Sequence, residues 1–136
     1  MFEQSCGDLN VDIVSLPLEE KINFNLKKNM IRAAINRGIF FEICYCDFIK
    51  DLQKRSVFIS NVLSMLDVTK GKNLIISSGC DNFLYHRSPY DIMIMYYQYN
   101  LRFQTIFDLK KEFVQDLISK NCENVYLKSS TKCIIK

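Results

Sequence analysis

Residues 38–45 read Gly-Ile-Phe-Phe-Glu-Ile-Cys-Tyr, and this run decides the fold class. Apolar side chains follow one another almost without interruption, which is typical of a β-strand that is covered on both faces. Such strands belong to parallel sheets, because the helices that connect parallel strands pack against the faces of the sheet. The run therefore predicts an α/β protein.

The segment before this strand has the periodicity of a helix. Residues 26–37 place apolar side chains at positions 26, 30, 31, 34 and 35, which form one stripe along a helix. Gly38 follows directly and is a typical residue for ending a helix, because it adopts a left-handed conformation at little cost. We therefore expect a helix over 26–37.

A second helix is predicted after the strand, over residues 51–69. Its buried side would hold Leu52 and Ile59, together with Val62, Met65 and Leu66. Lys70 and Gly71 are expected to end it, since a cation favours the negative end of the helix dipole and a glycine suits the residue after the last turn. Gly71 is thus assigned a structural role.

The rest of the chain continues this alternation. Ser88, Pro89 and Asp91 match the N-cap, the first-turn proline and the acidic third position of a helix. The other predicted elements are strands over 11–16, 74–76 and 125–127 and a helix over 105–121. Right-handed parallel crossovers connect such elements, either in a free-standing open sheet or in part of a barrel. With no linker or repeat, 1–136 is taken as a single domain.

Composition excludes several classes of protein. Hydrophobic residues make up 49% of the 136 and charged residues 24%, ordinary values for a soluble domain. No apolar run approaches the roughly 18 residues that cross a membrane, and the first residues lack the pattern of a secretory signal. Six cysteines without a Cys-x-x-Cys pair, and a single histidine, favour reduced thiols in an intracellular protein over a zinc site. No metal or other cofactor is expected.

Basic residues are concentrated in one part of the chain. Between Lys21 and Lys72 the chain has ten basic and four acidic residues, a local excess of +6, although the whole chain carries only +3. A basic half of this kind is compatible with a face that contacts RNA. Solvated helix faces also carry lysine, so the pattern alone does not decide between the two.

Parallel strands bring the residues that follow them to one edge of the sheet, where functional groups usually gather. These segments are residues 44–51, 77–87 and 128–132. The turns at the opposite edge, at Gly38 and over 70–73, are expected to serve stability. Candidate functional side chains are therefore sought at the edge where the strands end.

Two charged residues in buried surroundings have alternative interpretations. Glu42 lies within the apolar strand, and burial of its charge requires a partner or a solvated opening. Arg55 falls on the apolar line of its helix, near the edge where the strands end. It can pair with Glu42, which gives Glu42 a structural role, or it can contact a phosphate.

The sequence offers no catalytic machinery. Ser77 and Ser78 precede Gly79 and can offer hydroxyl and amide groups to an anion, although serine is also common in turns. No Gly-x-Ser-x-Gly motif surrounds them, His86 has no evident acidic partner, and no glycine-rich phosphate loop is present. No second carboxylate is evident for a general acid at Glu42. No catalytic residue is assigned.

Four segments in order resemble a known family. They are Arg-Gly-Ile-Phe-Phe-Glu-Ile-Cys-Tyr over 37–45, Lys-Arg-Ser-Val-Phe-Ile-Ser-Asn over 54–61, Lys-Gly-Lys-Asn-Leu-Ile-Ile-Ser-Ser-Gly over 70–79, and Arg-Ser-Pro-Tyr-Asp over 87–91. The series is similar to the thirty-kilodalton-type protein subunit of ribonuclease P and of the mitochondrial-RNA-processing ribonuclease. The resemblance covers about residues 10–132.

The resemblance implies a TIM-like barrel of the polymerase-and-histidinol-phosphatase type, of which this chain would be the C-terminal half, with the N-terminal half missing. It implies a noncatalytic subunit that binds ribonuclease P RNA, pairs with another small protein subunit and supports 5′-leader removal from precursor tRNA, which it meets only indirectly. The RNA carries out the cleavage. The implied location is the nucleus, in the nucleolus, and no membrane is involved.

Carried over by position, the resemblance implies RNA contacts for several residues and structural roles for others. The RNA-binding set is Lys54, Arg55, Lys72, Asn73, Ser77, Ser78 and Arg87, and the structural set adds Pro89, Tyr90 and Asp91. The family usually has Ser-Pro after the tyrosine where this chain has Cys46-Asp47, so this strand exit departs from the pattern. Two alternatives remain, a barrel-derived metal-dependent phosphoesterase and an incomplete gene product that does not assemble.

Overall fold

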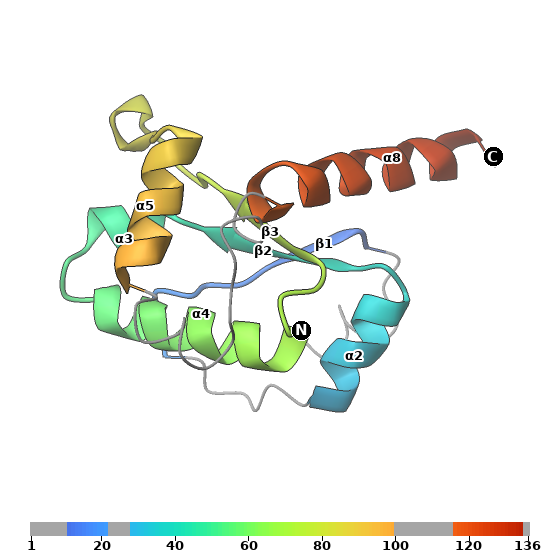
Figure 1. The fold of residues 1–136 in the computed structure, drawn as a ribbon, viewed down its shortest axis with the longest axis horizontal. Coiled ribbons are helices and arrows are strands. Elements are labelled where there is room, and N and C mark those ends of the chain that lie inside the picture. The colour runs from blue at the N-terminus through green and yellow to red at the C-terminus, as the bar shows by residue number, and fades with distance from the viewer. Residues whose placement is uncertain (1–10, 22–27, 100–115, 135–136) are drawn as a thin grey trace.

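A parallel sheet forms the centre of the molecule in the computed structural model, which describes residues 11–21, 28–99 and 116–134 (Figure 1). Its three strands are β1 (Ile13–Ser15), β2 (Phe40–Cys44) and β3 (Leu74–Ser77), in the order β1-β2-β3. The register places Phe41 opposite Val14 on one side and Leu74 on the other. The predicted α/β class with parallel βα units is therefore confirmed.

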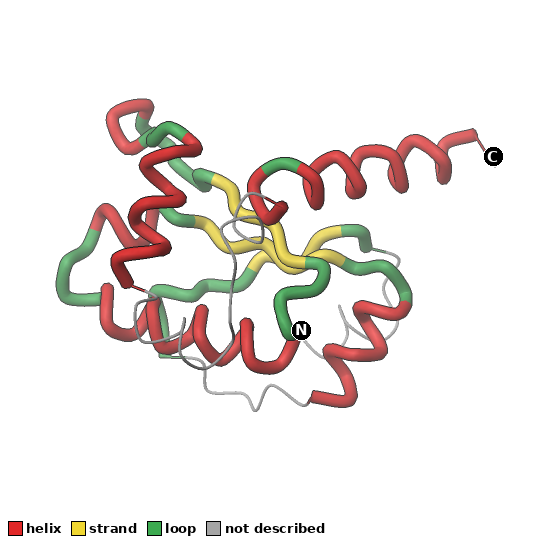
Figure 2. Tube along the Cα trace, viewed as in Figure 1, coloured by secondary structure: helices red, strands yellow, loops and turns green. Residues whose placement is uncertain are grey.

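Helices connect and cover these strands, as Figure 2 shows. They are α2 (Lys28–Asn36), α3 (Cys46–Lys50), α4 (Arg55–Thr69), the 3₁₀-helix η1 (Phe83–Tyr85), α5 (Pro89–Tyr99) and α8 (Lys120–Ile134). In Figure 1, α2 and α4 lie below the sheet, α8 lies above it, and α3 and α5 stand at one end. Within the described ranges no helix is long and apolar enough to span a membrane.

The core lies between the sheet and the helix pair α2 and α4. Phe41 and Ile43 of β2 are fully buried, and so are Leu74 of β3 and Ile31 of α2. Met65 of α4 packs into the same cluster. Alternate residues of β2 point to this core, because side chains alternate between the two faces of a strand. The apolar run thus fixes both the place of β2 in the sheet and the position of the helices.

The predicted helix ends are confirmed at two turns. α4 ends at Thr69, and Lys70 follows in a left-handed conformation with φ of 53° while its N–H donates to the Leu66 carbonyl. Gly71 comes next with φ of 75°, which a residue without a side chain adopts readily. Gly38 has φ of 79° after α2. Both glycines allow the chain to turn into the following strand.

The start of α4 differs from the prediction. Leu52, expected on the buried side of a helix over 51–69, is 70% exposed, and α4 begins only at Arg55. The reason is local, since the Gln53 N–H donates to Asp51 Oδ1 at 2.9 Å. An Asp side chain that binds the backbone two residues ahead makes a turn that competes with helix formation. The short α3 precedes this turn.

The strand predicted over 125–127 was wrong, because these residues lie within α8. The half-buried residues 121, 122, 125 and 128 recur every three or four positions, which is the spacing of a helix face. Asn121 Nδ2 also donates to the Leu74 carbonyl of β3 at 2.7 Å. The Asn121 side chain thus donates to a carbonyl on the outer side of β3 that would otherwise accept a hydrogen bond from a neighbouring strand.

α8 also closes the edge at which the strands begin. Lys128 Nζ donates to the carbonyls of Arg37 and Gly38, and it lies 3.5 Å from Asp12 Oδ1 before β1. A Cβ at Gly38 would stand 2.9 Å from this ammonium nitrogen, so the glycine permits the approach. Lys128 was expected where the strands end and lies at the opposite edge. Most of the helix predicted over 105–121 and the side chain of Lys132 fall outside the described residues.

We predict that Asn121→Ala lowers the free energy of unfolding by about 1–2 kcal/mol, because the buried Leu74 carbonyl loses its donor. Asn124→Ala is the matched control, since Asn124 is exposed on the same helix. Urea titration of both variants measures the difference. Equal midpoints for the two variants would show that the contact between α8 and β3 contributes nothing to stability.

Candidate nucleic-acid interface

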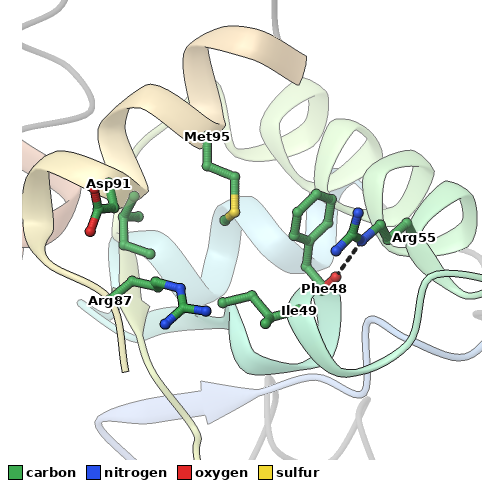
Figure 3. A pocket seen from close by; sticks show the side chains of 7 residues that line it. Phe48, Ile49, Arg55, Arg87, Asp91 and Met95 are labelled. Atoms are coloured by element: carbon green, nitrogen blue, oxygen red, sulfur yellow. Dashed lines mark hydrogen bonds between the residues drawn. The ribbon is translucent and has the colours of Figure 1, made fainter. Parts of the chain in front are cut away.

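A pocket opens at the edge where the strands end, with a volume of about 570 Å³. It lies between α3, the start of α4 and the start of α5 (Figure 3). Arg55 and Arg87 lie on opposite sides of it in this view, with Met95 above and Ile49 between them, beside the Arg87 guanidinium. The lining residues are Phe48, Ile49, Arg55, Arg87, Asp91, Ile92 and Met95. Two residues of the RNA-binding set thus meet in one hollow.

Arg55 is held at two points by a single residue of α3. Its Nε donates to the Phe48 carbonyl at 2.8 Å, and its guanidinium carbon lies 4.7 Å from the centre of the Phe48 ring. Phe48 is buried and packs in a tilted arrangement on Phe58 of α4, with 5.8 Å between ring centres. These two contacts fix the orientation of the Arg55 guanidinium, and its terminal nitrogens can bind a partner in the pocket.

Arg87 is held by backbone groups on the other side. Its Nη1 donates to the carbonyls of Leu84 and His86 at 3.1 and 3.2 Å, and its own N–H donates to the Tyr45 hydroxyl at 3.2 Å. Tyr45 is buried directly after β2. This bond fixes the segment that follows β3 against the end of β2, and it places Arg87 over the pocket.

The start of α5 has the predicted cap. The Asp91 N–H donates to Ser88 Oγ at 3.2 Å, and the Ser88 N–H donates to Asp91 Oδ2 at 3.3 Å. Pro89 is the first residue of the helix, where its missing N–H costs nothing. Tyr90 is 73% exposed. The reciprocal bonds fix the helix start beside Arg87 and engage the carboxylate of Asp91.

Two guanidinium groups and one carboxylate, that of Asp91, line the pocket, so its net charge is positive and favours an anion. Among the described residues, neither Arg55 nor Arg87 forms a salt bridge with a carboxylate. The amino-terminal ends of α4 and α5 lie at the same edge, and such ends carry a partial positive charge. Guanidinium groups bind phosphate and carboxylate oxygens in a forked geometry. The pocket can therefore hold an oxyanion such as a phosphate.

Lys72 and Asn73 lie at the opposite edge of the sheet, because they precede β3 whereas the pocket residues follow the ends of β2 and β3. Lys72 is exposed, and Asn73 has φ of 51° while its Nδ2 donates to the carbonyls of Ile39 and Ile35 at 3.1 and 3.4 Å. The Asn73 amide therefore ties the turn before β3 to the turn before β2. An RNA contact of either residue stays a prediction.

A second hollow of about 360 Å³ lies beside Lys72, between the ends of α2 and α4. Arg32, Lys70 and Lys72 contribute its positive charge. Helix carboxyl ends carry a partial negative charge that these cations complement, and Lys70 also pairs with Asp67 at 2.7 Å. This hollow therefore favours an anion less than the pocket of Arg55 and Arg87 does.

Ser77 and Ser78 take part in contacts at the strand ends. The Cys44 thiol lies 3.5 Å from Ser77 Oγ and 3.7 Å from Ser15 Oγ, so a polar line crosses all three strands. The Ser78 carbonyl accepts the Cys46 N–H at 3.0 Å. These contacts are structural, and they hold the exits of β2 and β3 together. Lys54 is exposed next to Arg55 and does not line the pocket.

The described cysteines lie at or near the ends of the strands and on α8. Cys44, Cys46, Cys80 and Cys122 are all free of disulfides. Desolvation, and then the neighbouring Cys46 side chain, raise the pKa of Cys80 to about 11. Cys80 is therefore protonated and unreactive near neutral pH. Within the described part of the chain, no three His, Cys, Asp or Glu side chains come together in a way that could hold a metal ion.

Glu42 and Arg55 do not pair, so the structure does not form the predicted salt bridge. Arg55 is turned to Phe48, while Glu42 is half-buried on β2 on the face of the sheet toward α8. Burial, and to a smaller extent the charge of Glu42, raises the pKa of Cys122 on α8. The sequence did not indicate a different acidic pair, Glu19 after β1 and Asp47 after β2. Their common position behind parallel strands is the signal that could have found it.

Glu19 and Asp47 interact where the strands end. Burial, and then the charge and hydrogen bonding of Glu19, raise the pKa of Asp47, while Lys50 and Lys54 oppose the rise. Glu19 Oε2 is buried and has no hydrogen-bond partner. A proton on Asp47 can satisfy this oxygen, because a protonated carboxyl is a donor. Asp47 directly precedes Phe48, which supports Arg55.

The fold and site together define a class of protein: an α/β domain of parallel βα units with an arginine-lined pocket where its strands end. The chain belongs to the RNase P subunit p30 family, whose profile matches residues 1–133. Its relatives include subunits of ribonuclease P from several eukaryotes. The family resemblance that the four sequence segments indicated is therefore confirmed.

Three relatives illustrate the match. Over 132 residues, 97% of this chain, it is 35% identical to ribonuclease P protein subunit p30 of Mus musculus, covering 46% of that protein. It is 27% identical over 97% of its length to probable ribonuclease P protein subunit 3 of Schizosaccharomyces pombe, covering 53%. It is 42% identical over 93% of its length to Protein GAMETOPHYTE DEFECTIVE 1 of Arabidopsis thaliana, covering 20%. The chain thus spans about half or less of these relatives.

We predict that Asp47→Asn makes the protein more stable at pH 7, by on the order of 0.5 kcal/mol after solvent screening. The raised pKa of Asp47 means that the wild type loses stability as pH rises above the ordinary carboxyl value of 3.8. Asparagine cannot ionise and can donate to Glu19. Urea unfolding from pH 3 to pH 8 measures the gain, and Asp51→Asn is the control. A gain that grows toward pH 3 would contradict the assignment.

Proposed function

We propose that this chain is a noncatalytic, RNA-binding part of a ribonuclease P protein subunit. In this role it contacts ribonuclease P RNA, pairs with another small protein subunit and supports removal of the 5′ leader from precursor tRNA. A role in the related mitochondrial-RNA-processing ribonuclease and a location in the nucleus, in the nucleolus, are part of the same proposal. The observation that carries it is the meeting of Arg55 and Arg87 in one pocket.

The fixed positions of the two guanidinium groups support this role. Backbone carbonyls already orient both side chains, so binding a phosphate would cost little further side-chain conformational entropy. RNA-binding proteins place arginine where it can neutralise phosphates, and contacts with the phosphate backbone of the RNA supply much of the affinity. Lys54, exposed beside Arg55, can extend the same contact along the RNA backbone.

We further propose that the sheet belongs to a TIM-like barrel of the polymerase-and-histidinol-phosphatase type. Its strands are parallel and joined by helices, and the chain spans only part of its relatives. Among the described residues no strand pairs with the outer side of β1, whereas Asn121 already occupies the Leu74 carbonyl at β3. Further strands would therefore join most readily at β1.

The two alternatives have less support. A metal-dependent phosphoesterase would require a cluster of metal-binding side chains, and the described residues offer none. An incomplete product that fails to assemble would show neither cooperative unfolding as a monomer nor binding to ribonuclease P RNA. Neither alternative explains two arginines that are oriented by carbonyls and face a common pocket.

We predict that Arg55→Ala and Arg87→Ala each weaken binding to ribonuclease P RNA about tenfold or more, because a charge-assisted contact contributes roughly 1.5–3 kcal/mol. Each change should also lower the slope of log affinity against log salt by roughly 0.7–0.9, since fewer counterions are released. Filter binding at several salt concentrations measures both quantities.

Arg32→Ala is the matched control, because Arg32 is an exposed arginine at the opposite edge of the sheet. It removes the same charge and should leave the affinity within about twofold, a difference worth only about 0.4 kcal/mol. If all three variants lose affinity equally, the contact is a general effect of charge and the pocket has no special role. The proposal then fails at its central observation.

A further inference from the structure

The pocket of Arg55 and Arg87 has a second component that phosphate binding does not use. Four of its seven lining residues are apolar. Phe48 and Ile92 are buried, while Ile49 and Met95 are half-buried and line the space between the two guanidinium groups. An apolar wall offers a phosphate no hydrogen bond or counter-charge, and a phosphate is stabilised only by water and by charged or polar donors. These apolar side chains can instead pack against a flat apolar group that belongs to the same ligand as the anion.

We propose that the pocket receives one unpaired nucleotide of RNA, with its base against Met95 and Ile49 and its phosphate between Arg55 and Arg87. The inference rests on the proposed RNA-binding role and names the RNA element that this site takes. A pocket of about 570 Å³ is within the range of roughly 300–1,000 Å³ that small-molecule sites occupy. It is therefore large enough for a nucleotide-sized ligand.

The arrangement of the side chains follows this chemistry. In Figure 3 the Met95 sulfur points down between the two arginines, and thioethers make favourable contacts with aromatic rings. Arg55 rests on the Phe48 ring, and the planes of arginine guanidinium groups are surfaces on which RNA bases stack. Charged and apolar groups thus line the same hollow, as the phosphate and the base of one nucleotide require.

An unpaired nucleotide suits the pocket better than an RNA duplex does. A duplex presents phosphates and 2′-hydroxyls on a convex surface and keeps its bases stacked inside, so it would leave the apolar wall of a concave pocket empty. Loops and bulges can turn a base outward, and such bases are the usual targets of specific RNA recognition. The exposed position of Arg87 leaves the mouth of the pocket accessible to such a base.

The test compares two RNA hairpins, one with a single-nucleotide bulge and one fully paired, that are otherwise identical. We expect the wild-type chain to bind the bulged hairpin at least about tenfold more tightly. Met95→Trp should fill the space and reduce this preference to about twofold or less, while affinity for the paired hairpin is retained. Ile94→Trp is the matched control, because Ile94 is 55% exposed on the same helix, and it should keep the preference.

A second measurement on the unchanged protein does not depend on how the variants fold. Titration with 5′-AMP should shift the methyl resonance of Met95 upfield through the ring current of the base, and Met95→Leu assigns that resonance. The resonance of the buried Met65 in the core should not move. Binding of free AMP that is weaker than binding of the bulged RNA points to RNA as the source of the nucleotide.

The outcomes separate this inference from the proposed function. If the wild type binds both hairpins equally, still depends on Arg55 and Arg87, and shows no shift of Met95, the nucleotide inference is overturned and the RNA-binding role stands. If RNA binding does not depend on the arginines, the pocket takes no part in it, and the proposed function loses the observation that carries it. A preference that survives Met95→Trp and a shifted Met65 would each contradict the placement of the base.

Discussion

Parallel pairing of β2 with both β1 and β3 is the constraint on which the rest of the structure depends. Because all three strands run the same way, each segment that follows a strand arrives at one edge of the sheet. Phe48, Arg55 and Arg87 line one pocket there, although the first two follow β2 and the third follows β3. The burial of Phe41 and Ile43 holds β2 in the centre, and so it also holds the pocket in place.

Much of this fold was predictable from the sequence, because apolar periodicity and turn residues are local signals. The central strand, helices α2 and α4 and the cap of α5 followed from such patterns. The short α3 was not predicted, and Leu52 was placed wrongly because Asp51 starts a turn. The strand expected over 125–127 failed for a physical reason. Three apolar residues fit either a strand or a helix face, and only the long-range bond from Asn121 to the Leu74 carbonyl decides between them.

The site was predictable in part. Strand order indicated the edge at which the pocket lies, and the resemblance singled out Arg55 and Arg87, which line it. The support of Arg55 by Phe48 and the interaction of Glu19 with Asp47 were not predictable, because they join residues from different elements whose orientation the sequence does not encode locally. Lys128 shows the same limit, since an error in one element moved it to the wrong edge.

The central claim is that RNA meets this chain at the edge where its strands end. Ultraviolet cross-linking of an assembled ribonuclease P particle, followed by peptide mass spectrometry, tests it most directly. The account predicts cross-links between the RNA and peptides that contain residues 48–55 and 84–95. Cross-links confined to residues 28–37 and 67–73, at the opposite edge, would contradict it.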